Sequence, residues 1–321
     1  MKKNFKLVAD SRLSGLEMSA GLKYRILSDI KQTEEPEVKK KISLSAAIVL
    51  ALILATTAAF ALTELEQALR LGLLIFPTDK GIQPVELARE AEARGFDSLW
   101  FPEHSHIPVS RRTPWGGREG APPLPEEYWR THDQFIALAA IAGATERIKL
   151  GTGITLVAQR DPIWLAKEIA SLDMISNGRV LFGVGYGWNH EEMESHGVDP
   201  RTRRRLVREK VLAMKQLWTQ DEAEFHGEFV NFDKSWSWPK PVQQPHPPII
   251  IGASPTPLHF RHIVEYGDAW MPIEGRFPVD DKWIDLQQAA TDAGRDPATL
   301  QLGVFGAKPD AGHLALSLIH I

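Results

Sequence analysis

The chain has 321 residues, of which 43% are hydrophobic and 24% charged, as is ordinary for a globular protein large enough to bury a full core. A formal net charge of -4 argues against nucleic acid as the main partner. The absence of cysteine excludes a disulfide scaffold, zinc or iron–sulfur sites with cysteine ligands, and a thiol nucleophile.

The first predicted element is an uncharged hydrophobic segment, residues 42–62, which is about long enough to cross a bilayer as a helix. Lysines precede it and glutamates follow it, a bias that predicts a membrane anchor with the charged tail, residues 1–41, in the cytoplasm. A cleaved signal peptide is an alternative, because Ala59-Phe60-Ala61 has the form of a cleavage site. A buried core helix is a third interpretation, although such a helix normally carries a polar stripe.

After this segment, short apolar runs alternate with amphipathic helices. The predicted strands are 70–76, 98–101, 148–157, 179–185, 248–254, 269–273 and 300–305. Helices are predicted to start at Pro84, at a capping box of Thr131 and Gln134, at Asp161-Pro162 and at Asp199-Pro200. In the last of these helices, Val207, Val211, Met214 and Trp218 fall on one face.

Strands that alternate with helices indicate βαβ units around a parallel sheet. Seven such units with apolar strands predict an α/β fold, a TIM-type (β/α)8 barrel that stops before its eighth strand. The stretch from Ala223 to Phe232 is predicted to be an inserted hairpin. Four of the ten tryptophans occupy core-like positions: Trp100, Trp164, Trp218 and Trp270.

In such a barrel the chemistry takes place at the C-terminal ends of the strands. Glu103, His104 and His106 follow the second predicted strand. A histidine there can exchange a proton near neutral pH, and the preceding glutamate would orient it. A solvated loop histidine is the competing interpretation. A zinc site built from these three residues is weak, because no H-E-x-x-H spacing supports it, and we expect no metal.

Glycine-rich turns follow the next three strands. Small residues let a ring or a phosphate approach the backbone, and N–H groups at a helix start favour an anion. Two such turns on neighbouring strands predict a phosphorylated cofactor, although tight packing or a helix cap would explain each turn alone. The candidate cofactor-binding residues are Thr152, Gly153, Ile154, Gly185, Tyr186, Gly187, Gly252, Ala253 and Ser254.

A Rossmann site is disfavoured, because Trp188 occupies the last glycine position of a G-x-G-x-x-G pattern. Instead, residues 70–308 resemble the luciferase-like monooxygenase superfamily, and within it the probable coenzyme F420-dependent oxidoreductases. The similar segments include ARGFDSLWFPEHSHIPVSR, ERIKLGTGITLVAQRDPIWLAKEIASLDMISNGRVLFGVGYGWNHEEME, EFHGEFVNFDKSWSWPKPVQQPHPPIIIG and YGDAWMP.

The resemblance implies a deazaflavin across the barrel mouth, with His104 beside its ring and Glu103 as the neighbour of His104. It also implies a non-proline cis peptide near Gly153-Ile154 behind the ring. It assigns Gly185 and Gly187 to the cofactor side chain and residues 252–254 to its phosphate.

The expected activity is hydride transfer between reduced coenzyme F420 and a small organic substrate, with His104 as proton donor or acceptor. The sugar-phosphate dehydrogenases of the superfamily carry an acidic residue in the region of Trp188, so we expect a more apolar substrate pocket here. An FMN-dependent monooxygenase and an inactive, membrane-tethered barrel are the alternatives. A homodimer is one possible assembly.

Both ends of the chain depart from the resemblance. Members of the superfamily begin just before the first predicted strand, and they are cytoplasmic, whereas residues 42–62 predict membrane anchoring. At the other end, residues 309–321 do not match the superfamily, and the last six correspond to the translation of a sequencing-transposon end. A chimeric gene is the hypothesis that explains both ends, and a natural fusion is the alternative.

Overall fold

The computed structural model describes residues 70–306 of the chain. The predicted tail 1–41, the predicted anchor 42–62 and the divergent end 309–321 fall outside the described residues, so these interpretations stay predictions. Within residues 70–306, no helix is both long enough and apolar enough to cross a membrane.

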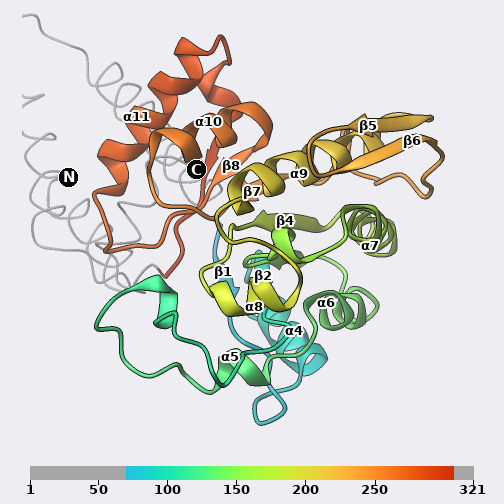
Figure 1. The fold of residues 1–321 in the computed structure, drawn as a ribbon. Coiled ribbons are helices and arrows are strands. Elements are labelled where there is room, and N and C mark those ends of the chain that lie inside the picture. Colours follow the sequence, from blue (N-terminus) through green and yellow to red (C-terminus); the bar gives the residue numbers. More distant parts are fainter. Residues whose placement is uncertain (1–69, 307–321) are drawn as a thin grey trace, which may run out of the picture. The chain divides into compact units, whose positions relative to one another are not determined.

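The centre of residues 70–305 is a parallel sheet in which the order of the strands follows their order in the chain (Figure 1). Its strands are β1 (Gly72–Leu74), β2 (Ser98–Phe101), β3 (Lys149–Thr152), β4 (Val180–Val184), β7 (Ile249–Ile251), β8 (Ala269–Trp270) and β9 (Gln301–Leu302). This confirms the α/β class and a parallel sheet of the TIM type. Among the described residues, β1 and β9 are the outer strands, and each pairs with one neighbour.

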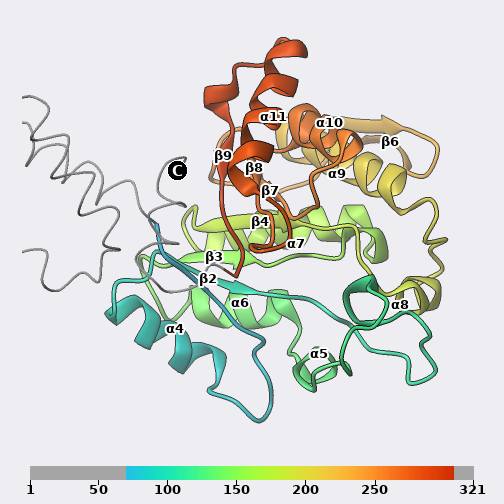
Figure 2. The same cartoon turned by 90° about the vertical axis from the view of Figure 1, so that its left-hand side faces the viewer.

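Helices connect the strands and cover the sheet (Figures 1 and 2). The α-helices are α4 (Pro84–Ala93), α5 (Glu127–Arg130), α6 (Gln134–Ala142), α7 (Pro162–Ile175), α8 (His190–Ser195), α9 (Arg203–Thr219), α10 (Pro257–Tyr266) and α11 (Val279–Asp292). Short 3-10 helices are η1 (Trp115–Gly117), η2 (Val157–Gln159) and η3 (Pro297–Thr299). Figure 2 shows α5 and α8 at the same end of the sheet, together with the long loop that follows β2.

The core lies between the sheet and these helices. Strand residues such as Leu99, Phe101, Leu150 and Phe182 are fully buried. Burying each such side chain stabilises the fold by roughly 1.5–3 kcal/mol.

The predicted apolar face of α9 is confirmed, since Val207, Val211, Met214 and Trp218 are all buried. Trp270 is also buried, whereas the prediction for Trp164 is wrong, because this side chain is 70% exposed. Trp164 lies on the outer side of α7, and an apolar side chain in a helix does not by itself show which face is covered.

Two predicted helix starts need correction. The N-cap of α6 is Asp133, whose carboxylate accepts a hydrogen bond from the Ile136 N–H, and not the predicted box of Thr131 and Gln134. Gln134 is buried and bonds to the strand ends instead: its amide donates to the Phe101 carbonyl and accepts from the Thr155 hydroxyl.

Helix α9 begins at Arg203, three residues after Pro200, because the Asp199 carboxylate accepts from the Arg201 N–H in a turn before the helix. The third strand is shorter than the predicted 148–157, since β3 ends at Thr152 and the chain then turns into η2. The predicted inserted hairpin is confirmed: β5 (Ala223–His226) and β6 (Asn231–Ser235) are antiparallel and lie beside α9 (Figure 1).

Candidate active site

A cavity of about 560 Å³ opens at the C-terminal ends of the strands, and its size is typical of small-molecule sites. The loops after β2, β3, β4 and β7 each contribute to its wall. Most of the residues predicted for the site line this cavity: Glu103, His104, Gly153, Ile154, Gly185, Tyr186, Gly187, Trp188, Gly252, Ala253 and Ser254. The structure therefore brings together residues that are up to about 150 positions apart, as expected for a barrel site.

Thr152 is the exception among the predicted cofactor-binding residues. Its side chain is fully buried, and it is not part of the cavity wall. The hydroxyl accepts a hydrogen bond from the Gly183 N–H at 2.7 Å and donates to the Gly183 carbonyl at 2.9 Å. Thr152 therefore fastens β3 to β4, because both hydrogen-bonding groups of its side chain are used between the strands.

His104 lies against α8. Its Nδ1 atom is 2.7 Å from Oε2 of Glu192, and the other carboxylate oxygen of Glu192 accepts from the Ser105 N–H. The Glu192 side chain is fully buried. With Nδ1 donating to this carboxylate, Nε2 is the nitrogen left for a partner in the cavity. The arrangement is that of a histidine oriented for proton exchange.

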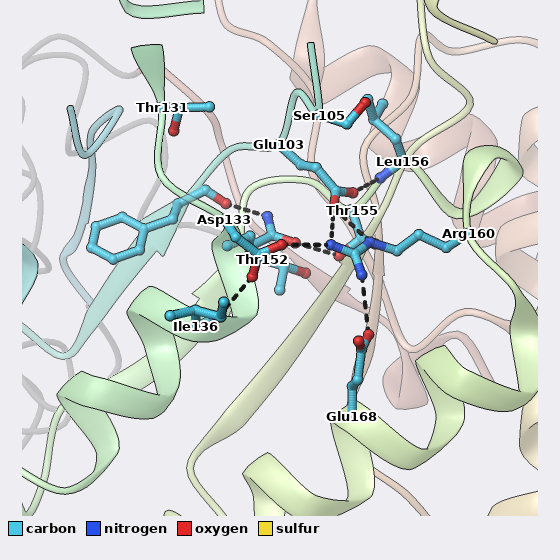
Figure 3. A network of polar contacts seen from close by, with 12 residues as sticks. Glu103, Ser105, Thr131, Asp133, Ile136, Thr152, Thr155, Leu156, Arg160 and Glu168 are labelled. Atoms are coloured by element: carbon cyan, nitrogen blue, oxygen red, sulfur yellow. Dashed lines mark hydrogen bonds and ion pairs between the residues drawn. The ribbon is translucent and has the colours of Figure 1, made fainter. Parts of the chain in front are cut away.

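The predicted partner of His104, Glu103, has a different role. Figure 3 shows its carboxylate directed toward Arg160 and toward the backbone of Leu156. Oε2 accepts from the Leu156 N–H at 2.6 Å, and Oε1 accepts from Nε of Arg160 at 2.6 Å. The prediction that Glu103 orients His104 is therefore wrong. Neighbouring residues in an extended segment point to opposite sides, and His104 takes the side facing α8.

Arg160 is the centre of an ionic network (Figure 3). Besides Glu103, its guanidinium donates to Glu168 at 3.1 Å and to Asp133 at 3.2 Å. Burial raises the pKa of Glu168, and the positive charge of Arg160 only partly offsets this effect. The network joins the loop after β2 to η2, α6 and α7, and it fixes the segment that follows β3.

That segment contains a cis peptide bond between Gly153 and Ile154, as the resemblance implied. The Ile154 side chain extends toward the next two strands. A Cβ atom at Gly185 would lie 2.1 Å from Cδ1 of Ile154, and one at Gly252 would lie 2.8 Å from its Cγ2. These two glycines are therefore needed to accommodate Ile154, so tight packing, the competing interpretation of the turns, accounts for them in this structure.

One end of the cavity is cationic. Arg203 and Arg204 both line it, and among the described residues neither forms an ion pair with a carboxylate. Nε of Arg203 is buried with no hydrogen-bond partner within residues 70–306. Burial lowers the pKa of Arg203, and the adjacent charge of Arg204 lowers it further. Two adjacent cations without a carboxylate partner within residues 70–306 are suited to bind a phosphate.

His259 connects this end to the turn after β7. Its Nδ1 lies 2.8 Å from the Ser254 carbonyl, to which it donates, so Nε2 accepts from Nε of Arg204 at 3.2 Å. The His259 ring stacks on Tyr186 at 4.8 Å. Burial lowers the pKa of His259, which agrees with a neutral ring held in one tautomer.

Tyr186 forms part of the cavity wall, and its hydroxyl is hydrogen-bonded to two residues of α10. The oxygen lies 2.8 Å from Nδ1 of His262 and 3.0 Å from the hydroxyl of Tyr266. Burial raises the pKa of Tyr186 to about 12, so the phenol stays protonated. The same effect lowers the pKa of His262 to about 4, so this histidine is neutral near pH 7. This part of the wall therefore carries no charge.

Aromatic rings form the other end. Trp188, the predicted substrate-pocket residue, lies 5.7 Å from the ring of His104, and Tyr128 lies 5.2 Å from it. Trp115 and Phe76 both pack on Tyr128, at 5.8 Å and 4.5 Å. Trp188 therefore lies in an aromatic cluster with Tyr128, Trp115 and Phe76, and its role as a substrate-pocket residue stays a prediction.

The sequence does not predict five residues of the cavity wall, Arg203, Arg204, His259, Tyr128 and Arg276, nor Glu192, which lies behind the wall and binds His104. The sequence does contain a signal for the two arginines, because the basic run of residues 201–205 directly follows the helix-start pattern Asp199-Pro200. Glu192 is one of three glutamates in four residues, and nothing in the sequence distinguishes it from its neighbours. The weak zinc hypothesis finds no support in the geometry, because Glu103 binds Arg160 and His104 binds Glu192.

The fold is an α/β fold with a parallel half-barrel sheet of the TIM type and a cavity at the C-terminal ends of its strands, and comparison with known proteins identifies its family. The model of the luciferase-like monooxygenase family matches residues 78–307. An uncharacterized protein of Mycobacterium tuberculosis is 44% identical over 246 residues, which cover 76% of this chain and 86% of that protein. The chain belongs to the luciferase-like monooxygenase family.

Two characterised relatives use different cofactors. An F420-dependent hydroxymycolic acid dehydrogenase of Mycobacterium tuberculosis is 31% identical over 66% of this chain and 55% of its own length. An FMNH2-dependent dimethylsulfone monooxygenase of Pseudomonas putida is 35% identical over 38% of this chain and 34% of its own length. Among solved structures, the monooxygenase RslO1 from Streptomyces bottropensis has a TM-score of 0.61 at 26% identity, over 73% of this chain and 70% of that one. The family is thus one of oxidoreductases that use F420 or FMN.

Proposed function

We propose that the protein transfers hydride between reduced coenzyme F420 and a small organic substrate, and that His104 delivers or takes up the accompanying proton. The observation that carries this proposal is the pair of His104 and buried Glu192 at the wall of a cavity whose other end holds Arg203 and Arg204. One end is suited to proton exchange and the other to a phosphate.

The residues at the cationic end fit the phosphate of such a cofactor. Arg203 has a buried Nε with no partner in the described residues, and Arg204 is held in place by the neutral His259. The turn of residues 252–254 lies beside them, because the Ser254 carbonyl accepts from His259. When bound, the cofactor supplies the hydride chemistry that protein side chains lack.

At the other end the protein orients the proton carrier and limits water. Glu192 holds His104 in one orientation, so that Nε2 is available to the substrate. The rings of Trp188 and Tyr128 pack against His104 and against each other, with 6.2 Å between their centroids, and they reduce access of solvent to it. A positioned proton carrier of this kind typically contributes about 10²–10⁴-fold to a rate.

An FMN-dependent monooxygenase on the same fold is the second candidate. The observation that favours it is that both cofactors carry a phosphate, and two arginines can neutralise either one. The FMNH2-dependent relative shows that the family accommodates this cofactor. Membrane attachment through residues 42–62 and formation of a homodimer also remain proposals.

The test is calorimetric titration of the purified full chain with oxidised F420 and with FMN, each in parallel with the Arg203→Gln and Arg204→Gln variants. We expect F420 to bind more tightly, and each variant to lose about tenfold or more in affinity, because each removes a charged hydrogen bond to phosphate. Arg201→Gln is the matched control, since that guanidinium is exposed and pairs with Asp199. Tighter binding of FMN would favour the second candidate, and binding of neither would refute both.

A further inference from the structure

The aromatic end of the cavity contains two arginines that the proposed function does not use. Arg118 follows η1, and Arg276 follows β8. Both line the cavity with Trp115 and Tyr128. A Cβ atom at Gly116 would lie 3.9 Å from Nη2 of Arg276, so the two segments that carry these arginines meet across the opening.

Both arginines are exposed to solvent at this end of the cavity. Within residues 70–306, no carboxylate lies at salt-bridge distance from Arg118 or Arg276. The only acid among the described residues of the cavity wall is Glu103, and its charge is taken up by Arg160. The aromatic end therefore combines an apolar wall with two exposed guanidinium groups that have no carboxylate partner among the described residues.

The cavity wall contains two pairs of arginines, Arg203 with Arg204 and Arg118 with Arg276, and each pair contacts a different part of the wall. Arg204 is joined through His259 to the turn after β7, whereas Arg276 lies against Gly116 in η1. A phosphate held by Arg203 and Arg204 leaves the other pair without a partner. Guanidinium groups bind carboxylates through paired hydrogen bonds, and they do so more strongly next to apolar surface than in open water.

We propose that the substrate is an apolar acid: its hydrocarbon or ring portion packs against Trp188, Tyr128 and Trp115, and its carboxylate pairs with Arg276 and Arg118. This inference rests on the proposed function for the reaction, but the binding of the acid does not depend on the cofactor. Arg118 and Arg276 are then specificity-determining residues, since they select the anion and leave the proton exchange to His104.

The test compares three probes of one shape by calorimetry on the full chain without cofactor: 4-phenylbutyrate, 4-phenylbutanol and 4-phenylbutylamine. We expect the acid to bind about tenfold or more tightly than the alcohol, and the amine to bind most weakly. Arg276→Gln and Arg118→Gln should each reduce the preference for the acid and leave the affinity for the alcohol unchanged.

Arg112→Gln is the matched control, because this guanidinium belongs to the same loop, is 89% exposed and does not line the cavity. Equal binding of acid and alcohol to the unmodified protein would overturn the proposal. So would a loss of acid binding in Arg204→Gln in place of Arg276→Gln, which would put the acid in the phosphate site. A loss of F420 affinity in Arg276→Gln would assign the arginine to the acidic tail of the cofactor and would also overturn it.

Discussion

Nδ1 of His104 lies 2.7 Å from Oε2 of Glu192, and the two residues are 88 positions apart in the sequence. The contact joins the loop after β2 to the first turn of α8. Both side chains are almost fully buried, at 6% and 0% exposure, so the carboxylate has few other partners. The pair therefore sets which nitrogen of His104 is presented to the cavity, and the orientation of that ring depends on a helix from another part of the barrel.

Removing either member of this pair should affect turnover more than cofactor binding. We expect His104→Ala to lower kcat by about 10²–10⁴-fold, and Glu192→Gln by about tenfold or more, because the ring loses its orientation. Cofactor affinity, measured separately by calorimetry, should change less than the rate does. Glu194→Gln is the control, since this residue is on the same helix and exposed. Unchanged turnover in His104→Ala would refute its assignment as the proton carrier.

The network around Arg160 should contribute to stability. Arg160 is 21% exposed and Glu103 is 9% exposed, so Arg160→Met leaves Glu103 buried without a cation. We expect a loss of about 3 kcal/mol in the free energy of unfolding, measured by urea denaturation. Glu168→Gln should cost much less, because this residue is 38% exposed and its removal leaves Arg160 paired. A double variant, Arg160→Met with Glu103→Gln, should lose less than the sum of the two single variants.

Glu191 should make the stability of the loop after β2 depend on pH. Burial disfavours ionisation of this carboxyl, but hydrogen bonds from Thr113 and from the Arg112 N–H outweigh it and lower the pKa of Glu191 to about 2. The ordinary value is 4.5, so the stabilisation is complete above pH 4.5 and is lost as the pH falls toward 2. The difference between these two pKa values of Glu191 corresponds to at most about 3 kcal/mol of stabilisation of the folded state.

The measurement is urea denaturation between pH 6 and about pH 3, together with limited proteolysis of residues 105–125. The unmodified protein should lose more stability over this range than Glu191→Gln, which has no charge to lose. The variant should also be cleaved faster in the loop at pH 6, because a neutral amide accepts more weakly from Arg112 and Thr113. Parallel stability curves for the two proteins would contradict the assignment.

The contact between Gly185 and Ile154 predicts a rescue experiment. Gly185→Ala introduces a methyl group that would lie 2.1 Å from Cδ1 of Ile154, so we expect a loss of about 1–3 kcal/mol in unfolding free energy and weaker cofactor binding. Adding Ile154→Ala should recover part of the lost stability. Gly143→Ala is the control, since its new methyl group would lie 3.9 Å from its nearest neighbour, the Ala140 carbonyl. No recovery in the double variant would show that another contact makes Gly185 necessary.

The strands and the turns that follow them could be predicted from the sequence. Apolar runs such as the one that contains Phe182 are buried on both faces, and the chemistry of a barrel collects where these runs end. This explains why His104, Tyr186 and Ser254, from three different turns, were expected together and do line one cavity. The local pattern fixes the strand, and the parallel topology brings the turns together.

The partners of these residues could not be predicted, because they depend on side-chain direction and on contacts between distant segments. Glu103 precedes His104 and is the partner that the sequence predicts for it, but the two side chains point to different sides. Similarly, Thr131 and Gln134 have the spacing of a capping box, yet burial of Gln134 at a strand end leaves the cap to Asp133. The outward position of Trp164 also depends on which side of α7 the neighbouring helices cover.

The hairpin of β5 and β6 leaves the barrel between β4 and β7, which are neighbours in the sheet. The chain therefore departs from one strand and returns to the adjacent one. The entropy of closing a loop grows only slowly with its length, by about 0.6 kcal/mol for each doubling. The hairpin itself, residues 223–235, can therefore change in length at a small entropic cost, whereas the returning segment is fixed by Gln243, which bonds Asp173 and the Val180 carbonyl at the start of β4. The hairpin is a place where related proteins can acquire new surfaces without rebuilding the catalytic end of the barrel.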